Sequence, residues 1–148
     1  MSLESFYSLT NSTDYILTAD SSEASTLLTE GYSYWYSPTS NIYSASTDYT
    51  GLVALYRASN PSTGSNYYTT TASVITTLVS KGWTNRGTAG YVLPATASMP
   101  SGWGALHIAE NTSDGVYLFT ASPTAFASLG SAWNKSSNAV CWVPNPSA

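Results

Sequence analysis

Three stretches of the chain share one order of apolar and polar positions. Each begins with a strand-like run, continues through a short polar turn, and resumes in a second run that ends at a Thr. Such runs on both sides of a turn predict a β-hairpin. The paired runs are residues 5–11 with 15–18, 54–60 with 66–69, and 105–111 with 116–120. An Asn side chain often accepts hydrogen bonds from the backbone of its own turn, so we interpret Asn11, Asn60 and Asn111, at the hairpin entrances, as structural.

Each predicted hairpin is followed by a stretch rich in Ser, Thr and Ala with apolar residues at helical spacing. These stretches are Ser22 to Thr29, Ala72 to Ser80 and Pro123 to Leu129. Since they are short and end near Gly, they predict helices of two or three turns with a glycine cap. A further apolar strand closes each unit, at residues 41–43, 90–93 and 140–143.

The three units cover about residues 5–48, 54–98 and 105–144 of a 148-residue chain. One unit alone cannot bury its apolar face, so we expect the three to share a core in a single domain, residues 1–148. The predicted fold is mostly β with short helical turns, three-fold pseudo-symmetric and β-trefoil-like. A small propeller-like array of three sheets fits the same repeat.

Charge and hydropathy narrow the range of partners. Charged residues make up 8 % of the chain, the net charge is −4, and there are only four cations, which argues against nucleic acid as a partner. No apolar run approaches the length of a membrane helix, so no membrane insertion is expected.

The N-terminus lacks a secretory signal pattern, which predicts a cytoplasmic protein or release without a signal peptide. A secreted mature form stays open, because a single Cys suits either compartment.

Few side chains in this sequence favour catalysis. The single histidine, His107, falls at a position that Tyr occupies in the other units, so we interpret it as a strand residue. Cys141 lies in an apolar run and is expected to be a buried thiol. Neither metal-ligand spacing nor a phosphate-binding glycine pattern occurs. We therefore expect no cofactor and no enzymatic activity.

The segment from Leu55 to Val92 resembles the repeat of a poorly characterised family of bacterial and fungal domains. The family pattern reads LYRxxNPxTGxHxYT and, after a short helix, GWxxEGxAxY; this chain has LYRASNPSTGSNYYT and GWTNRGTAGY. Asn66 stands where the family has His, and Arg86 where Glu is common. Members often lie beside cell-wall or carbohydrate-acting modules, so the resemblance implies glycan binding. In architecture and composition the chain is also similar to the small lectins of mushroom fruiting bodies.

Sugar binding calls for aromatic faces that stack on a pyranose ring and planar polar groups that bond its hydroxyls. The chain supplies five Trp and twelve Tyr. Phe6, Tyr68, Leu106, Phe119, Tyr91 and Trp142 are assigned to the core. The residues predicted to contact a ligand are aromatic and polar side chains near the turns and strand ends: Asp14, Tyr15, Trp35, Tyr36, Asn66, Tyr67, Trp83, Arg86, Asp114 and Tyr117.

The leading interpretation is a lectin with up to three related sites for glycans or glycoproteins, serving defence or recognition, with a homo-oligomer allowed. The alternative is a protease inhibitor of β-trefoil type that presents the loop Ser37 to Ser46 or Thr96 to Gly102. Neither loop carries Lys or Arg, which serine-protease inhibitors often offer. A tyrosine-rich interaction domain is a third interpretation.

Overall fold

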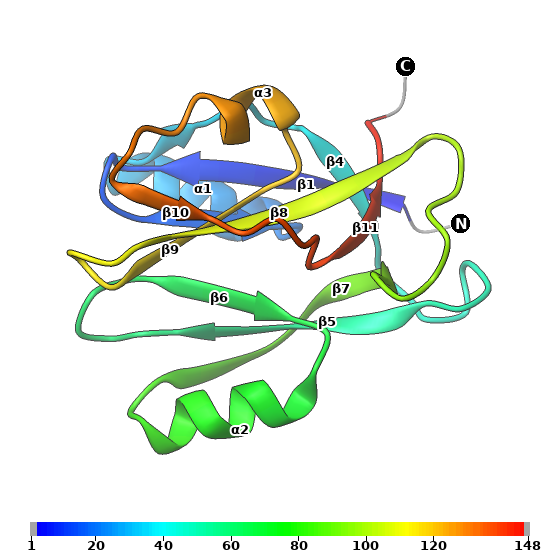
Figure 1. Ribbon diagram of the computed structural model, residues 1–148, viewed down its shortest axis with the longest axis horizontal. Helices are drawn as coiled ribbons and strands as arrows, with labels where there is room; N and C mark the ends of the chain where they lie inside the picture. Colours follow the sequence, from blue (N-terminus) through cyan, green and yellow to red (C-terminus); the bar gives the residue numbers. More distant parts are fainter. Residues whose placement is uncertain (1–2, 147–148) are drawn as a thin grey trace.

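The computed structural model describes residues 3–146 and shows a mostly β chain with three short helices (Figure 1). An order of hairpin, helix and returning strand occurs three times along these residues. The first run of elements is β1 (Leu3–Thr10), β2 (Tyr15–Thr18), α1 (Ser21–Thr29), β3 (Ser33–Tyr34) and β4 (Ser40–Tyr43). The second is β5 (Val53–Ser59), β6 (Asn66–Thr69), α2 (Ala72–Ser80) and β7 (Thr84–Pro94). The third is β8 (Trp103–Asn111), β9 (Val116–Thr120), α3 (Pro123–Ala127), β10 (Trp133–Lys135) and β11 (Cys141–Pro144).

The mostly β class, the hairpins and the short helices are confirmed, because local signals define them. Asp20 caps α1 by accepting hydrogen bonds from the backbone N–H groups of Ser22 and Glu23. Gly31 and Gly82 follow α1 and α2, each with φ of +96°, a conformation that ends a helix and favours glycine. The three helices are therefore found where the sequence places them, but α3 ends at Ala127 with Ser128 as its C-cap, so the predicted glycine cap holds for α1 and α2 and is wrong for α3.

The strands form one open antiparallel sheet in which the closing strands of the three runs are neighbours. The order is β10-β8-β11-β7-β4-β1-β2, while β5 pairs with β6 and β7, β9 with β8, and β3 with β1. Tyr43 of β4 lies opposite Tyr91 of β7, and Cys141 of β11 lies opposite Pro94 of β7. Through these pairings β7 joins the first and third runs. Three-fold symmetry, whether of β-trefoil or propeller type, stays a prediction.

The main core cluster draws on hairpins and closing strands from all three runs. Its buried members are Phe6, Leu17, Ile42, Leu55, Tyr68, Val92, Leu106, Phe119, Cys141 and Val143. Tyr68 is 1 % exposed, and its hydroxyl donates to the Leu17 carbonyl at 2.6 Å and accepts from the Leu17 N–H at 2.8 Å. The predicted core residues Phe6, Tyr68, Leu106 and Phe119 are confirmed as buried, whereas Tyr91 and Trp142 are half-buried against a smaller cluster.

The turn asparagines, the single cysteine and the single histidine lie in the environments that the sequence predicts. The backbone N–H two residues ahead donates to each Asn side chain: Thr13 to Asn11 at 3.0 Å, Ser62 to Asn60 at 2.9 Å and Ser113 to Asn111 at 3.2 Å. Cys141 is fully buried, and burial raises the pKa of its thiol. His107 lies in β8, where its ring stacks on Phe126 at 4.4 Å.

Within residues 3–146, none of the helices has both the length and the apolar character needed to span a bilayer.

Candidate functional site

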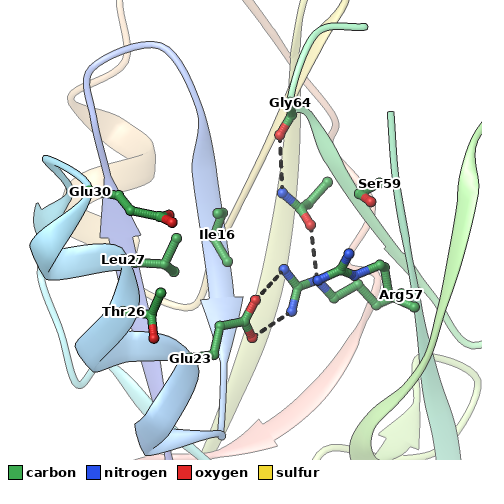
Figure 2. Close-up of a pocket in the computed structure, with 10 residues that line it drawn as sticks. Ile16, Glu23, Thr26, Leu27, Glu30, Arg57, Ser59 and Gly64 are labelled. Atoms are coloured by element: carbon green, nitrogen blue, oxygen red, sulfur yellow. Dashed lines mark hydrogen bonds and ion pairs between the residues drawn. The ribbon is translucent and has the colours of Figure 1, made fainter. Parts of the chain in front are cut away.

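A polar cavity of about 380 Å³ lies between α1 and the strands β5, β6 and β7 (Figure 2). We call it the arginine cleft. It is lined by Ile16, Glu23, Thr26, Leu27, Glu30, Arg57, Ser59, Gly64, Asn66 and Arg86. Figure 2 shows the side chains of α1 on one side and those of the second hairpin on the other. The cleft therefore forms between the first run, whose helix α1 packs on β1 and β2, and the second hairpin.

Arg57 forms the rear of this cleft and is held on two sides. It is 8 % exposed. Its Nη1 and Nη2 donate to the two carboxylate oxygens of Glu23 at 2.8 and 2.9 Å, and its Nε donates to Asn66 Oδ1 at 2.9 Å. Asn66 Nδ2 in turn donates to the Gly64 carbonyl at 3.2 Å. This fork-to-fork pairing fixes the guanidinium plane.

The electrostatics keep both members of the pair ionised. Burial raises the pKa of Glu23, but hydrogen bonds from Arg57 and Thr18 and the charges of Arg57 and Arg86 outweigh it, so the pKa of Glu23 lies below its usual value. Burial lowers the pKa of Arg57, while Tyr68 and Glu23 raise it more, so the guanidinium stays charged. Arg57 also lies 5.9 Å from the centre of the Tyr68 ring.

Two further charged side chains, Glu30 at the end of α1 and Arg86 of β7, line the cleft. Both residues are exposed. Within residues 3–146 the ion pair joins Arg57 and Glu23. The side chains of Glu30 and Arg86 make neither a hydrogen bond nor an ion pair in this part of the chain. The cleft thus offers one unpaired acceptor and one unpaired donor to a ligand.

A second cavity of about 470 Å³ lies against the third hairpin, and we call it the tyrosine pocket. It is lined by Tyr67, Ile108, Ala109, Glu110, Tyr117, Asn134 and Ser136. The rings of Tyr67 and Tyr117 meet edge to face, with centroids 4.8 Å apart, and Trp83 lies against both rings. The backbone N–H of Tyr117 donates to Ser65 Oγ at 2.9 Å, which ties β9 to the turn of the second hairpin.

Glu110 organises the polar side of the tyrosine pocket. Burial and the Glu110 carboxylate raise the pKa of Tyr117, and a hydrogen bond between the Tyr117 hydroxyl and Glu110 contributes to the same shift. Burial and Glu110 also raise the pKa of Tyr67. Both phenols therefore stay protonated at neutral pH; the Tyr117 hydroxyl donates to Glu110 and keeps its oxygen as an acceptor, while the Tyr67 hydroxyl can donate to a ligand.

The two cavities occupy corresponding places on neighbouring hairpins. In β5 and β6, Arg57 lies opposite Tyr68, and in β8 and β9, Ile108 lies opposite Phe119. The residue opposite is a buried core aromatic in both hairpins. Arg57 and Ile108 therefore occupy equivalent positions in their hairpins, but the arginine cleft has a charged side chain there and the tyrosine pocket an apolar one.

The predicted residues Tyr15, Trp35 and Tyr36 form an aromatic cluster with Trp133. Tyr15 lies 5.0 Å from Trp35 and 5.7 Å from Trp133, and Trp35 lies 5.3 Å from Tyr36, measured between ring centroids. Strand β3 ends at Tyr34, and Tyr36 has a positive φ of 54°. Adjacent residues of a strand point to opposite faces, but Trp35 and Tyr36 lie beyond the end of β3 and do not have this arrangement. Tyr36 is 48 % exposed.

The other predicted residues separate into three groups. Asn66 and Arg86 line the arginine cleft, and Tyr67 and Tyr117 line the tyrosine pocket with Trp83 beside them. Asp14 lines neither cavity: it is buried against Gly64, its Oδ1 has no hydrogen-bond partner, and burial raises its pKa. Asp114 is exposed in the turn between β8 and β9 and also lines neither.

Sequence reasoning missed four charged residues that line the cavities: Glu23, Glu30, Arg57 and Glu110. Arg57 belongs to the LYR motif, which was a usable signal because a charged residue inside an otherwise apolar strand needs a partner. Glu23 and Glu30 are two of the few carboxylates of the chain, but nothing local links them to Arg57. Among residues 3–146 no group of three His, Cys, Asp or Glu side chains could hold a metal ion.

Comparison with known proteins identifies a family. The model of a family described as a domain of unknown function, DUF5648, matches residues 2–93. Neither a curated protein nor a solved structure matches the chain. The matched residues cover more than half of the sequence and include the whole arginine cleft. The chain therefore belongs to the DUF5648 family.

Proposed function

We propose that the protein binds carbohydrate and that the tyrosine pocket is its saccharide site. The observation that carries this proposal is the joint lining of one cavity by two tyrosine rings, a carboxylate, an amide and a hydroxyl. Tyr67 and Tyr117 supply aromatic surface for the C–H face of a sugar ring. Glu110, Asn134 and Ser136 supply acceptors and donors for its hydroxyls.

Size and context support the same function. A cavity of about 470 Å³ falls within the range of about 300–1,000 Å³ that is usual for small-ligand sites. The resemblance of residues 55–92 to domains found beside carbohydrate-acting modules points to the same ligand class. We further propose that a lectin of this kind uses several weak sites on one body, which gain strength together on a glycan-dense surface.

A glycan-array screen of the purified protein, followed by calorimetric titration of the best ligand, tests the proposal. We expect Tyr117→Ala and Glu110→Gln each to weaken binding by about tenfold or more, the loss that corresponds to one good hydrogen bond or stacking contact. Asp114→Asn is the matched control, because it changes an exposed carboxylate outside the pocket to an amide. Folded protein that binds no saccharide on the array would contradict the proposal.

No observation favours the protease-inhibitor alternative. Residues 40–43 of the loop Ser37 to Ser46 form strand β4 and are buried, so that range is not a free loop. The segment Thr96 to Gly102 is a connection with an exposed Met99, and it carries no charged residue that would enter a protease pocket.

A further inference from the structure

We infer that the arginine cleft is a second saccharide site, which recognises adjacent hydroxyl groups of a neutral sugar by hydrogen bonds without an aromatic stacking face. The inference extends the proposed function to a different cavity with a different lining. It assigns the ligand class from the donors and acceptors that the cleft leaves unused.

The buried guanidinium of Arg57 has donors to spare. A guanidinium carries five N–H groups. Three of them bond Glu23 and Asn66, which leaves two without a protein partner in the described part of the chain. Arg57 is 8 % exposed and lines both the cleft and an adjoining cavity of about 180 Å³, so its guanidinium is shielded from bulk solvent where it borders these cavities. A ligand acceptor that enters the cleft can therefore bond a donor that the protein already holds in place.

Glu30 and Arg86 extend the set of unused groups to the cleft entrance. They come from α1 and β7 and do not pair with each other in residues 3–146. A sugar hydroxyl both donates and accepts, so one hydroxyl can donate to Glu30 while its neighbour accepts from Arg86. The two walls of the cleft thus offer an acceptor and a donor to the hydroxyls of one ligand.

The charge balance favours a neutral ligand over an anion. The cleft is lined by two arginines and two glutamates, so its formal charges cancel. The charge of Arg86 already acts on Glu23, and the net charge of −4 on the whole chain opposes anions at longer range. A neutral polyhydroxyl ring meets no such penalty.

The rest of the lining explains how recognition here differs from that in the tyrosine pocket. Ile16 and Leu27 give the cleft an aliphatic side, and no aromatic residue lines it. Hydrogen-bond geometry therefore selects the ligand, whereas stacking contributes in the tyrosine pocket. The cavity of about 380 Å³ is large enough for one sugar residue on the usual scale of ligand sites, roughly 300 Å³ and above.

A titration followed by nuclear magnetic resonance can observe the two cavities separately. The probes are methyl α-mannopyranoside, methyl β-glucopyranoside and methyl β-galactopyranoside, added to the ¹⁵N-labelled full chain. The Arg57 Nε–H and the Asn66 side-chain amide report on the arginine cleft, and the Trp83 indole N–H reports on the tyrosine pocket. We expect at least one glycoside to shift the signals of the cleft in a saturable way.

Two changes that each remove one charge from the cleft, and two matched controls, make the result decisive. We expect Arg86→Ala and Glu30→Gln each to weaken the cleft response by about tenfold, without affecting the Trp83 response. Lys81→Ala and Glu4→Gln make the same charge changes at exposed positions outside the cleft and should leave both responses unchanged. The 2-deoxy analogue of the best glycoside, which lacks one of two adjacent hydroxyls, should bind the cleft about tenfold more weakly.

The outcomes separate this inference from the proposed function. Saccharide shifts at Trp83 with none at Arg57 and Asn66 would overturn the second site and leave the tyrosine pocket intact. Shifts at the cleft alone would support the second site and contradict the tyrosine pocket as the primary one. Tighter cleft binding of methyl β-glucuronide than of methyl β-glucopyranoside would overturn the assignment to a neutral ligand.

Discussion

At the scale of single residues, the pairing of Arg57 with Glu23 is the contact on which the arginine cleft depends. Glu23→Gln keeps the shape of the side chain but removes its charge. We expect it to lower the free energy of unfolding at neutral pH by roughly 1.5–3 kcal/mol, the contribution of hydrogen bonds to a charged group, because the buried guanidinium loses its counter-ion. Urea denaturation measures the loss, and Glu4→Gln, on an exposed carboxylate, is the control.

The same pair gives that stability difference a definite pH dependence. The pKa of Glu23 is lower in the folded protein than its ordinary value of 4.5. Its stabilising contribution is therefore fully present above pH 4.5 and is lost as the pH falls through the lower folded pKa. Denaturation curves of wild type and Glu23→Gln should converge in acid. A difference that stays constant there would show that Glu23 acts through packing and not through its charge.

The contacts of single residues could be predicted from the sequence only where the two partners lie close together along the chain. The role of Asn11, Asn60 and Asn111 was predictable, because each bonds a backbone group two residues away. The partner of Arg57 was not, because Glu23 lies 34 residues before it and reaches it only when the first hairpin, with α1 packed on it, lies beside the second. Tyr67 and Tyr117 were selected as aromatic residues near turns and both line the tyrosine pocket, whereas Glu110 joins them through the pairing of β8 with β9, which places it opposite Tyr117.

At the scale of elements, α1 carries Glu23, Leu27 and Glu30 to the cleft, so its end caps support the site. Asp20→Ala removes a side chain that bonds two backbone N–H groups, and we expect a loss of about 1 kcal/mol in the free energy of unfolding. Thr71 is the matched control, because it precedes α2 without a side-chain cap bond, so Thr71→Ala should change stability by less than about 0.5 kcal/mol. Equal losses for both variants in urea denaturation would contradict this account.

Elements built from local signals were predictable, and those built from docking were not. The three hairpins and helices follow from turns, caps and apolar spacing. Strand β3 is only two residues long and exists by pairing with β1, so the run Tyr34 to Tyr36 gave no reliable signal for it. Strand β7 pairs with β5 of its own run, but its two other neighbours, β4 and β11, come from the first and third runs and are remote in sequence.

At the scale of the whole molecule, the three runs are linked through their closing strands and through one core. The core cluster includes Leu106, Phe119, Cys141 and Val143, which all lie beyond the family match at residues 2–93. The last third of the chain therefore completes the core cluster against which the second hairpin packs. It contributes no residue to the lining of the arginine cleft. It also supplies most of the tyrosine pocket.

The junction between the first and second runs is close-packed at Gly90. A Cβ added there would lie 2.6 Å from Ile42 Cδ1, 2.7 Å from Ile42 Cγ1 and 3.0 Å from the Tyr43 carbonyl oxygen. We expect Gly90→Ala to destabilise the protein by about 1–3 kcal/mol through overpacking. Ile42→Ala alone should cost about 2–5 kcal/mol. Because Ala lacks both Cγ1 and Cδ1, the double variant should lose clearly less than the sum of the two, as measured by urea denaturation in a double-mutant cycle. Strictly additive losses would mean that β4 and β7 do not meet at Gly90 in solution.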